Sequence, residues 1–385
     1  MLPFGVMMAG NVSAADEVIY VKDGGTGDGS SEANAFGSLT DAVTAAAALT
    51  NDAEVVIVGE FYFDFSTAAY STPKHTNKIT IRGKDNTAKL SVKTGKVWSL
   101  GGELEICNLN IDLVKNTSFT FTTLFYPITF GEGLNVTNSV DTTAEKKYLS
   151  VRSVGKTDTT NAKLWNATEE KFIGDSTITI KSGRFEDVVL FGQNGNDVTR
   201  TLDGTINLVV QGDPIINNLV VSRSANFVCT NANISLDGGT IGRFVGATDR
   251  KYTAGIVKYG PSGVTGTFIL YITKNFDLAG QSALIGTDES NTTEFVLALC
   301  GATANKDYAG ALDDANLGTY VLKADAEVFN AVKAETVKIN QATFDKVIKV
   351  SADNANTGDA TVVFAVVACI SLAAVVVFSK KRTTR

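Results

Sequence analysis

The chain is poor in histidine, proline and cysteine, and each shortage excludes a kind of site. Its 385 residues include one histidine, His75, in a polar stretch, which excludes centres built on several histidines. The four cysteines stand far apart without a Cys-x-x-Cys pair, so neither a disulfide framework nor a zinc site is indicated. The net charge of −7 argues against nucleic acid and anionic lipid as partners.

The chain is rich in the residue types that are common in short strands and turns. It holds 35 glycines against 5 prolines, and Val, Ile, Thr, Asn and Asp are frequent. In the middle of the chain, short alternating strands are each followed by Gly or Asx residues, and no helix of ten or more residues separates them. Ile178, Ile206 and Ile234 recur at intervals of 28 residues, and Phe268 follows after 34. Such a period predicts stacked repeats, with the three isoleucines in one interior column.

Repeats made only of strands and turns predict an all-β solenoid. One apolar face per strand would fill the interior as like positions stack. The alternative is a β-sandwich whose strands happen to be evenly spaced. Glycines after each strand favour the solenoid, because a sandwich gives no reason for them.

The N-terminal part adds a strand, a glycine-rich loop and a short helix. The strand is Val18–Val21, the loop runs from Gly24 to Ser31, and Ser38–Asp41 resembles a capping box. Strands beginning near Val55, Ile79 and Leu104 then follow about 25 residues apart. This order resembles the right-handed parallel β-helix proteins of the pectin-lyase-like family, over about residues 18 to 290. The resemblance implies that the helix plugs the open end of the core.

The two ends of the chain predict export and anchoring. Residues 1–15 are small and apolar and end in Val-Ser-Ala-Ala, typical of a signal peptide. No basic residue precedes Lys22, so either the true start lies upstream or the assigned start is wrong. The uncharged run 360–378 matches the roughly 20 residues that a membrane-spanning helix needs. The basic residues from Lys380 onward would stay inside the cell.

The residues before this run resemble a cell-wall sorting signal. Asn356, Thr357, Gly358 and Asp359 lie where Gram-positive surface proteins carry Leu-Pro-x-Thr-Gly, although Ala355 replaces the proline. The resemblance implies a sortase-like transpeptidase as a partner and display on the outer face of a Gram-positive-type cell. The expected organisation is a signal peptide (1–15), an ectodomain (16–305) with an insertion at about 115–175, a cap or linker (306–352), and the anchor (353–385).

Residues able to do chemistry are sparse. Asp197 and Asp203, near Arg200, form the most acidic amide-rich cluster and would suit Ca²⁺, but a solvated turn explains them as well. No cofactor or metal is therefore expected. The resemblance to pectin-lyase-like proteins implies an acid cluster with a basic partner for cleaving acidic polysaccharides, and no such cluster stands out.

Aromatic residues in the predicted insertion suggest binding instead. Phe119, Phe121, Tyr126 and Trp165 lie there and would suit a glycan or a protein ligand if exposed, or the core if buried. We therefore expect a non-enzymatic adhesin that binds an extracellular glycan or a host or matrix protein. The alternative is a surface-tethered polysaccharide lyase or glycoside hydrolase.

Overall fold

The computed structural model describes ten segments of the chain. These are residues 17–154, 162–191, 200–222, 227–242, 244–247, 257–259, 264–273, 283–285, 294–300 and 321–324. The predicted signal peptide and anchor lie outside them. Unit 1 of the fold comprises residues 1–167 and 176–188, and unit 2 comprises 168–175 and 189–385.

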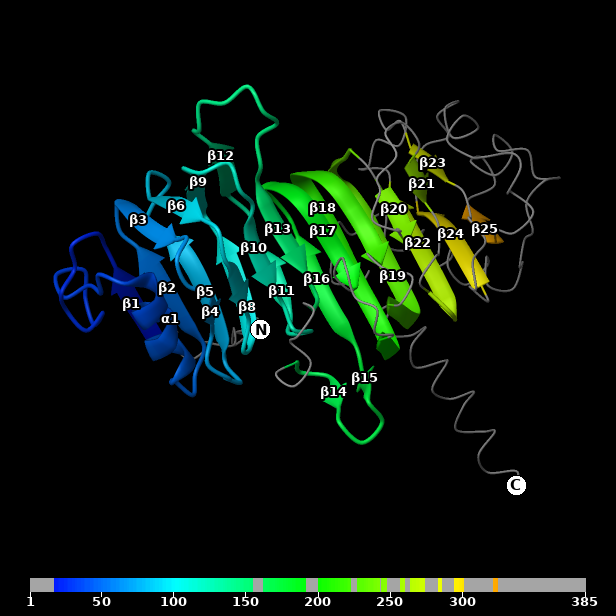
Figure 1. Ribbon diagram of the computed structural model, residues 1–385, viewed down its shortest axis with the longest axis horizontal. Helices are drawn as coiled ribbons and strands as arrows, with labels where there is room; N and C mark the ends of the chain where they lie inside the picture. Colours follow the sequence, from blue (N-terminus) through cyan, green and yellow to red (C-terminus); the bar gives the residue numbers. More distant parts are fainter. Residues whose placement is uncertain are drawn as a thin grey trace, which may run out of the picture. The chain divides into compact units, whose positions relative to one another are not determined.

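The described chain is an all-β, parallel solenoid of about six turns with one short helix (Figure 1). In unit 1 a coil contributes one strand to each of three families. The first family is β1 (Glu17–Val21), β2 (Ala53–Ile57), β5 (Lys78–Gly83), β8 (Glu103–Cys107), β11 (Ile128–Phe130) and β16 (Ser176–Ile180). The second is β3 (Glu60–Phe65), β6 (Lys89–Thr94), β9 (Leu109–Leu113) and β12 (Leu134–Asn138). The third is β4 (Tyr70–Ser71), β7 (Val97–Ser99), β10 (Phe119–Thr122) and β13 (Leu149–Arg152). These parallel ladders confirm the solenoid and not the sandwich.

The core is built from columns of apolar side chains on successive coils. One column of the first family is Ile19, Val55, Ile81, Ile106, Phe130 and Ile180. All six side chains are buried. Because side chains alternate between the two faces of a strand, in-register stacking puts every second residue of each strand in the interior.

The predicted helix is confirmed as α1 (Leu39–Ala47). The Ser38 hydroxyl caps it by accepting a hydrogen bond from the backbone N–H of Asp41 at 3.2 Å. Leu39, Val43 and three alanines form its buried face. Its C-terminal end is also held, because the Asn77 amide donates to the carbonyl of Ala46 at 3.1 Å.

The glycine-rich loop, which in the structure comprises residues 22–37 between β1 and the cap of α1, covers the free edge of β1. Tyr20 N–H donates to the Gly29 carbonyl at 2.9 Å, and Phe36 N–H donates to the Tyr20 carbonyl at 2.9 Å. The loop packs so closely that a Cβ added to Gly37 would lie 2.1 Å from the Gly25 carbonyl oxygen. The glycines therefore permit a close backbone approach that protects an edge strand.

Unit 2 continues the parallel pattern with longer strands. Its ladder contains β15 (Lys171–Ile173), β18 (Arg200–Ser222), β19 (Phe227–Ile241), β20 (Phe244–Ala247), β22 (Thr267–Thr273), β24 (Glu294–Cys300) and β25 (Val321–Ala324). A separate pair joins β21 (Val257–Tyr259) to β23 (Ala283–Ile285). β14 (Trp165–Asn166) belongs to unit 1, and β17 (Arg184–Phe191) begins in unit 1 and ends in unit 2.

The predicted isoleucine column needs a correction. Ile178, Ile206 and Ile234 are all buried, as expected. However, Ile206 lies opposite Ala232, and Ile234 lies opposite Leu208 and Leu270. The observed pairing is shifted by two residues from the predicted pairing of Ile206 with Ile234. A shift of two keeps every side chain on the same face of its strand, so the alternation of the sequence cannot reveal it. Along this ladder the offset between partners is not constant: it falls from 27 to 26 residues between Leu202 and Thr205, and to 25 between Gly212 and Ile215.

The predicted insertion is narrower than 115–175. Strands β10, β11 and β12 span residues 119–138 and continue the coils in register. β13 at 149–152 also pairs with β10. The irregular part between these strands is the loop at 139–148, between β12 and β13. Strand β10 is rich in Thr and Phe, and this composition suggested an insertion. Its alternating residues, however, are those of a regular strand of the solenoid.

Candidate ligand-binding face

The outer side of β3, β6, β9 and β12 carries an ordered array of polar side chains, called here the polar face. One row across it is Glu60, Lys89, Asn110 and Asn135, and the next is Tyr62, Ser91, Asp112 and Thr137. Asp64 lies opposite Lys93 in a third row. The alternate residues of the same strands point inward and are mostly apolar, which gives each strand one polar side.

Hydrogen bonds and ion pairs link the rows into one network. Lys89 Nζ lies 3.2 Å from Glu60 Oε1 and 3.4 Å from Asp112 Oδ2. The Ser91 hydroxyl donates to Glu60 Oε1 at 3.0 Å. Asp112 is buried and accepts from the Thr137 hydroxyl at 3.0 Å. The side chains of the face are thereby held in fixed positions before any ligand arrives.

Two carboxylates of the face, Glu60 and Asp64, have a lowered pKa. The Ser91 hydroxyl, followed by Lys89, lowers the pKa of Glu60. The Ser66 hydroxyl, followed by Lys93, lowers the pKa of Asp64 to about 2. A general acid for glycoside cleavage needs a raised pKa. Glu60 and Asp64 are therefore suited to accepting hydrogen bonds and unsuited to donating a proton.

Tyr62 stands on the polar face with 49 % of its surface exposed. Among the side chains whose burial the structure describes, Tyr62 is the one large aromatic that is exposed. Its neighbours on its own strand are Glu60 and Asp64, so an apolar ring lies among charged and hydrogen-bonding groups. An amphipathic ring at such a place suits a ligand that has both an apolar side and polar edges.

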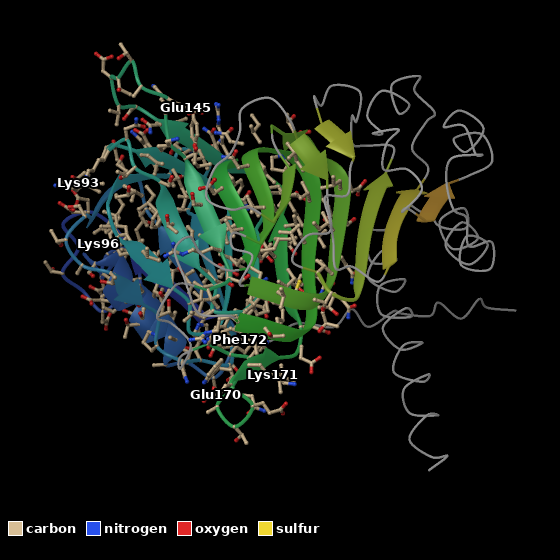
Figure 2. All side chains as sticks on the ribbon, turned by 45° about the vertical axis from the view of Figure 1, so that its right-hand side comes forward. Lys93, Lys96, Glu145, Glu170, Lys171 and Phe172 are labelled. Atoms are coloured by element: carbon tan, nitrogen blue, oxygen red, sulfur yellow. The ribbon has the colours of Figure 1, made fainter. Side chains whose placement is uncertain are left out.

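Lysines gather where the polar face turns toward the third strand family. Lys93 pairs with Asp64 at 3.0 Å, and Figure 2 shows Lys93 and Lys96 projecting outward on this side of unit 1. A Cβ added to Gly95 would lie 3.5 Å from Lys115 Nζ, so the Lys115 ammonium lies over the neighbouring coil. Lys96 and Lys115 make no side-chain hydrogen bond or ion pair within the described segments. They leave positive charge available at the border of the face.

Two of the predicted aromatic ligand contacts belong to the core. Phe119 and Phe121 are buried, with ring centroids 4.6 Å apart, and Phe121 lies 5.7 Å from the buried Trp98. Their alternation puts both rings on one face, and the in-register pairing of β10 with β7 turns that face inward. Both rings therefore take the second of the two places considered for them, the core, and neither is exposed to a ligand.

Tyr126 and Trp165 are partly buried. Burial raises the pKa of the Tyr126 hydroxyl. The N–H of Lys163 donates to the Leu124 carbonyl at 2.9 Å, which holds the segment before Trp165 beside the turn that precedes Tyr126. Neither residue belongs to a strand of the polar face: Tyr126 lies between β10 and β11, and Trp165 lies in β14.

The acidic pair suggested for calcium is only partly described. Asp203 is exposed and pairs with Lys171 at 3.1 Å, while Lys171 also pairs with Glu169 at 2.8 Å (Lys171 is labelled in Figure 2). The carboxylate of Asp203 is thus paired with a cationic side chain. Asp197 lies outside the described residues. No group of three or more His, Cys, Asp or Glu side chains that could hold a metal occurs in the described part of the chain.

His75, Cys107 and Cys229 lie outside the strands of the polar face. The Nδ1 atom of His75 lies 2.8 Å from the Asn77 carbonyl oxygen, in a turn. Cys107 and Cys229 are free thiols. The sorting residues 356–359 and the apolar run 360–378 lie outside the described residues, and within the described ones no helix is long and apolar enough to span a bilayer.

The polar face itself was missed from the sequence, although a signal for it exists. Residues 60–65 read Glu-Phe-Tyr-Phe-Asp-Phe, in which Tyr62 shares the polar side of a strict alternation. The remaining face residues come from three further strands whose register the sequence does not reveal. Comparison with protein-family models, curated proteins and solved structures finds no match to this chain.

Proposed function

We propose that this protein is a non-enzymatic adhesin, anchored at the cell surface, which recognises an extracellular glycan through the polar face. The observation that carries the proposal is the exposed ring of Tyr62 at 49 % within a pre-formed network of hydrogen-bonding groups. A sugar presents an apolar side of C–H groups and a rim of hydroxyls. The ring would stack on the former, and Glu60, Lys89 and Asn110 would bind the latter.

The spacing of the face supports a ligand that extends over several coils. Parallel strands lie about 4.8 Å apart, so the accessible polar groups of the first row, Glu60, Lys89, Asn110 and Asn135, recur at that interval across β3, β6, β9 and β12. Because the side chains are already hydrogen-bonded to one another, little conformational entropy would be lost on binding. Lys96 and Lys115 extend the surface at its border.

Binding rather than cleavage is favoured by the state of the acids. The pKa of Glu60 is lowered, and Lys89 is shared between Glu60 and Asp112. The carboxylate of Glu60, next to Tyr62 on the face, thus accepts hydrogen bonds from Ser91 and Lys89 and is a poor proton donor. The proposal therefore departs from the polysaccharide lyase or glycoside hydrolase considered above.

Display at the cell surface is part of the same proposal. Residues 1–15 would direct export, 360–378 would span the membrane, and Asn356–Asp359 would be the sorting signal of a Gram-positive-type cell. We also infer right-handed coils of the pectin-lyase-like type, because parallel crossover connections are right-handed in about 98 % of cases. Protease treatment of intact cells should release most of the chain, and Thr357→Ala should move it from the wall to the membrane fraction. Recovery in the cytosol would contradict the proposal.

Glycan binding is tested by changing the Tyr62 ring. Tyr62→Ala should weaken binding on a glycan array and in calorimetry by roughly tenfold, and Tyr62→Phe should retain most of it because the ring is kept. Ile215→Ala is the matched control, since Ile215 is 41 % exposed in unit 2. Equal binding by Tyr62→Ala and the unmodified protein, or cleavage of the glycan by the purified protein, would overturn the assignment.

A further inference from the structure

The outer edge of β3 is a strand edge that the described chain leaves uncovered. The sheet of the second family runs in the order β12, β9, β6, β3, so β3 is a terminal strand. We propose that this edge binds an extended peptide of a partner protein, with basic residues at alternate positions, as an added β-strand. The proposal rests on backbone groups and does not depend on glycan binding.

The direction of the backbone groups follows from one hydrogen bond. Lys89 N–H donates to the Gly59 carbonyl at 2.9 Å, so residue 59 directs its backbone toward β6. Because successive residues of a strand point their backbone groups to opposite sides, Phe61, Phe63 and Phe65 also face β6. The N–H and C=O groups of Glu60, Tyr62 and Asp64 then face away from it. These three residues have no backbone hydrogen bond on that side within the described segments.

The contrast with β1 shows that the end of the solenoid is not covered uniformly. On β1, the outward-facing groups of Tyr20 donate to Gly29 and accept from Phe36, both at 2.9 Å. The glycine-rich loop thus takes the place of a neighbouring strand there. An uncovered edge is a template for pairing with another chain.

The outer face beside this edge is exposed. Tyr62 is 49 % exposed, and the side chains of Glu60 and Asp64 are 65 % and 40 % exposed. Exposure of all three alternate side chains leaves room beside the strand on its outer face.

The rows of the polar face define the chemistry of the partner. An added strand would place its own side chains opposite Glu60, Tyr62 and Asp64. Cross-strand pairs favour opposite charges and aromatic or β-branched partners for an aromatic ring. The complementary peptide therefore carries Lys or Arg at the first and fifth positions and an aromatic or β-branched residue at the third.

A second copy of the chain is a poor occupant of this edge. Antiparallel pairing of two β3 strands about Tyr62 would set Glu60 of one copy opposite Asp64 of the other. Like charges directly opposite one another are destabilising. Glu60 and Asp64 each pair with a lysine of β6, and a basic partner strand would add a second cation beside each carboxylate, whereas self-association would bring a second carboxylate there.

The first test uses the full-length protein and a fluorescent peptide of sequence Lys-Thr-Val-Thr-Lys with blocked ends. Two further peptides carry N-methyl groups on the odd or on the even residues, which removes the N–H donors of one edge. We expect the parent peptide to bind, one methylated peptide to lose roughly tenfold or more in affinity, and the other to bind as the parent does. Equal binding by all three, or no binding by the parent, would overturn the proposal.

The second test changes the protein. Tyr62→Pro removes an outward N–H, which an edge strand tolerates because that group is not part of the ladder to β6. It should weaken peptide binding about tenfold or more, whereas Tyr62→Ala keeps the N–H and should weaken it less. Hydrogen exchange should show that the peptide slows the amides of Tyr62 and Asp64. Protection of these amides by self-association without peptide would contradict the proposal. If the protein binds the peptide but no glycan, the peptide-binding edge stands and the proposed glycan-binding function fails.

Discussion

The indole Nε1 of Trp98 donates a hydrogen bond to the Thr72 hydroxyl over 2.9 Å, and both side chains are buried. The bond joins successive coils within the third strand family, where Trp98 also lies opposite Tyr70. A buried indole N–H without a partner is destabilising, so this bond specifies how the coils stack.

Thr72→Val should destabilise the fold by about 1–3 kcal/mol, because it leaves the indole N–H of Trp98 unsatisfied. In a Trp98→Phe background the same change should have a smaller effect, since the donor is already gone. Urea unfolding of the single and double variants measures the coupling. Additive free energies of unfolding would show that the bond contributes nothing.

Ile106→Ala should lower the free energy of unfolding by about 2–5 kcal/mol, because Ile106 is buried between Ile81 and Phe130 in an interior column. Thr129→Ala is the control on the outer side of β11 and should change it by no more than about 0.5 kcal/mol. Thermal or urea unfolding distinguishes the two. Similar effects of both substitutions would contradict the assignment of inner and outer faces.

Gly37→Ala should displace the loop that covers β1. A Cβ there would lie 2.1 Å from the Gly25 carbonyl oxygen, a backbone atom that cannot turn aside as a side chain can. We expect about 1–3 kcal/mol of destabilisation and faster hydrogen exchange at the Tyr20 amide. Asp23→Ala in the same loop should leave that exchange unchanged, and unaltered exchange in Gly37→Ala would argue against the cap.

Ser66→Ala should raise the pKa of Asp64 from about 2 toward 3.8, because the Ser66 hydroxyl is the main cause of the lowered value. A lowered pKa means that the ionised carboxylate is favoured in the folded state. Its stabilising contribution is present above the unfolded pKa and is lost as the pH falls through about 2. Carboxyl NMR titration measures the change, with Ser30→Ala beside Asp28 as the control. An unchanged Asp64 titration in Ser66→Ala would contradict the hydrogen-bond explanation.

The sequence by itself determined the local features. Ser38 followed by an alanine-rich segment was enough to predict helix α1, because capping and the spacing of buried residues along a helix are local properties of the sequence. Alternation with a period near 25 was enough for the solenoid, because each strand must bury one face and stacking is how a repeat achieves it. The burial of Ile178, Ile206 and Ile234 followed from the same alternation.

Only the tertiary structure decided register and direction. A shift of two residues leaves every side chain on its own face, so the partner of Ile206 could not be known from the pattern. The same pattern allowed Phe119 and Phe121 to point either way, and pairing with β7 turned them inward. Tyr62 belongs to a face that exists only when four distant strands lie side by side, and the open edge of β3 exists only because no later segment pairs with it within the described chain.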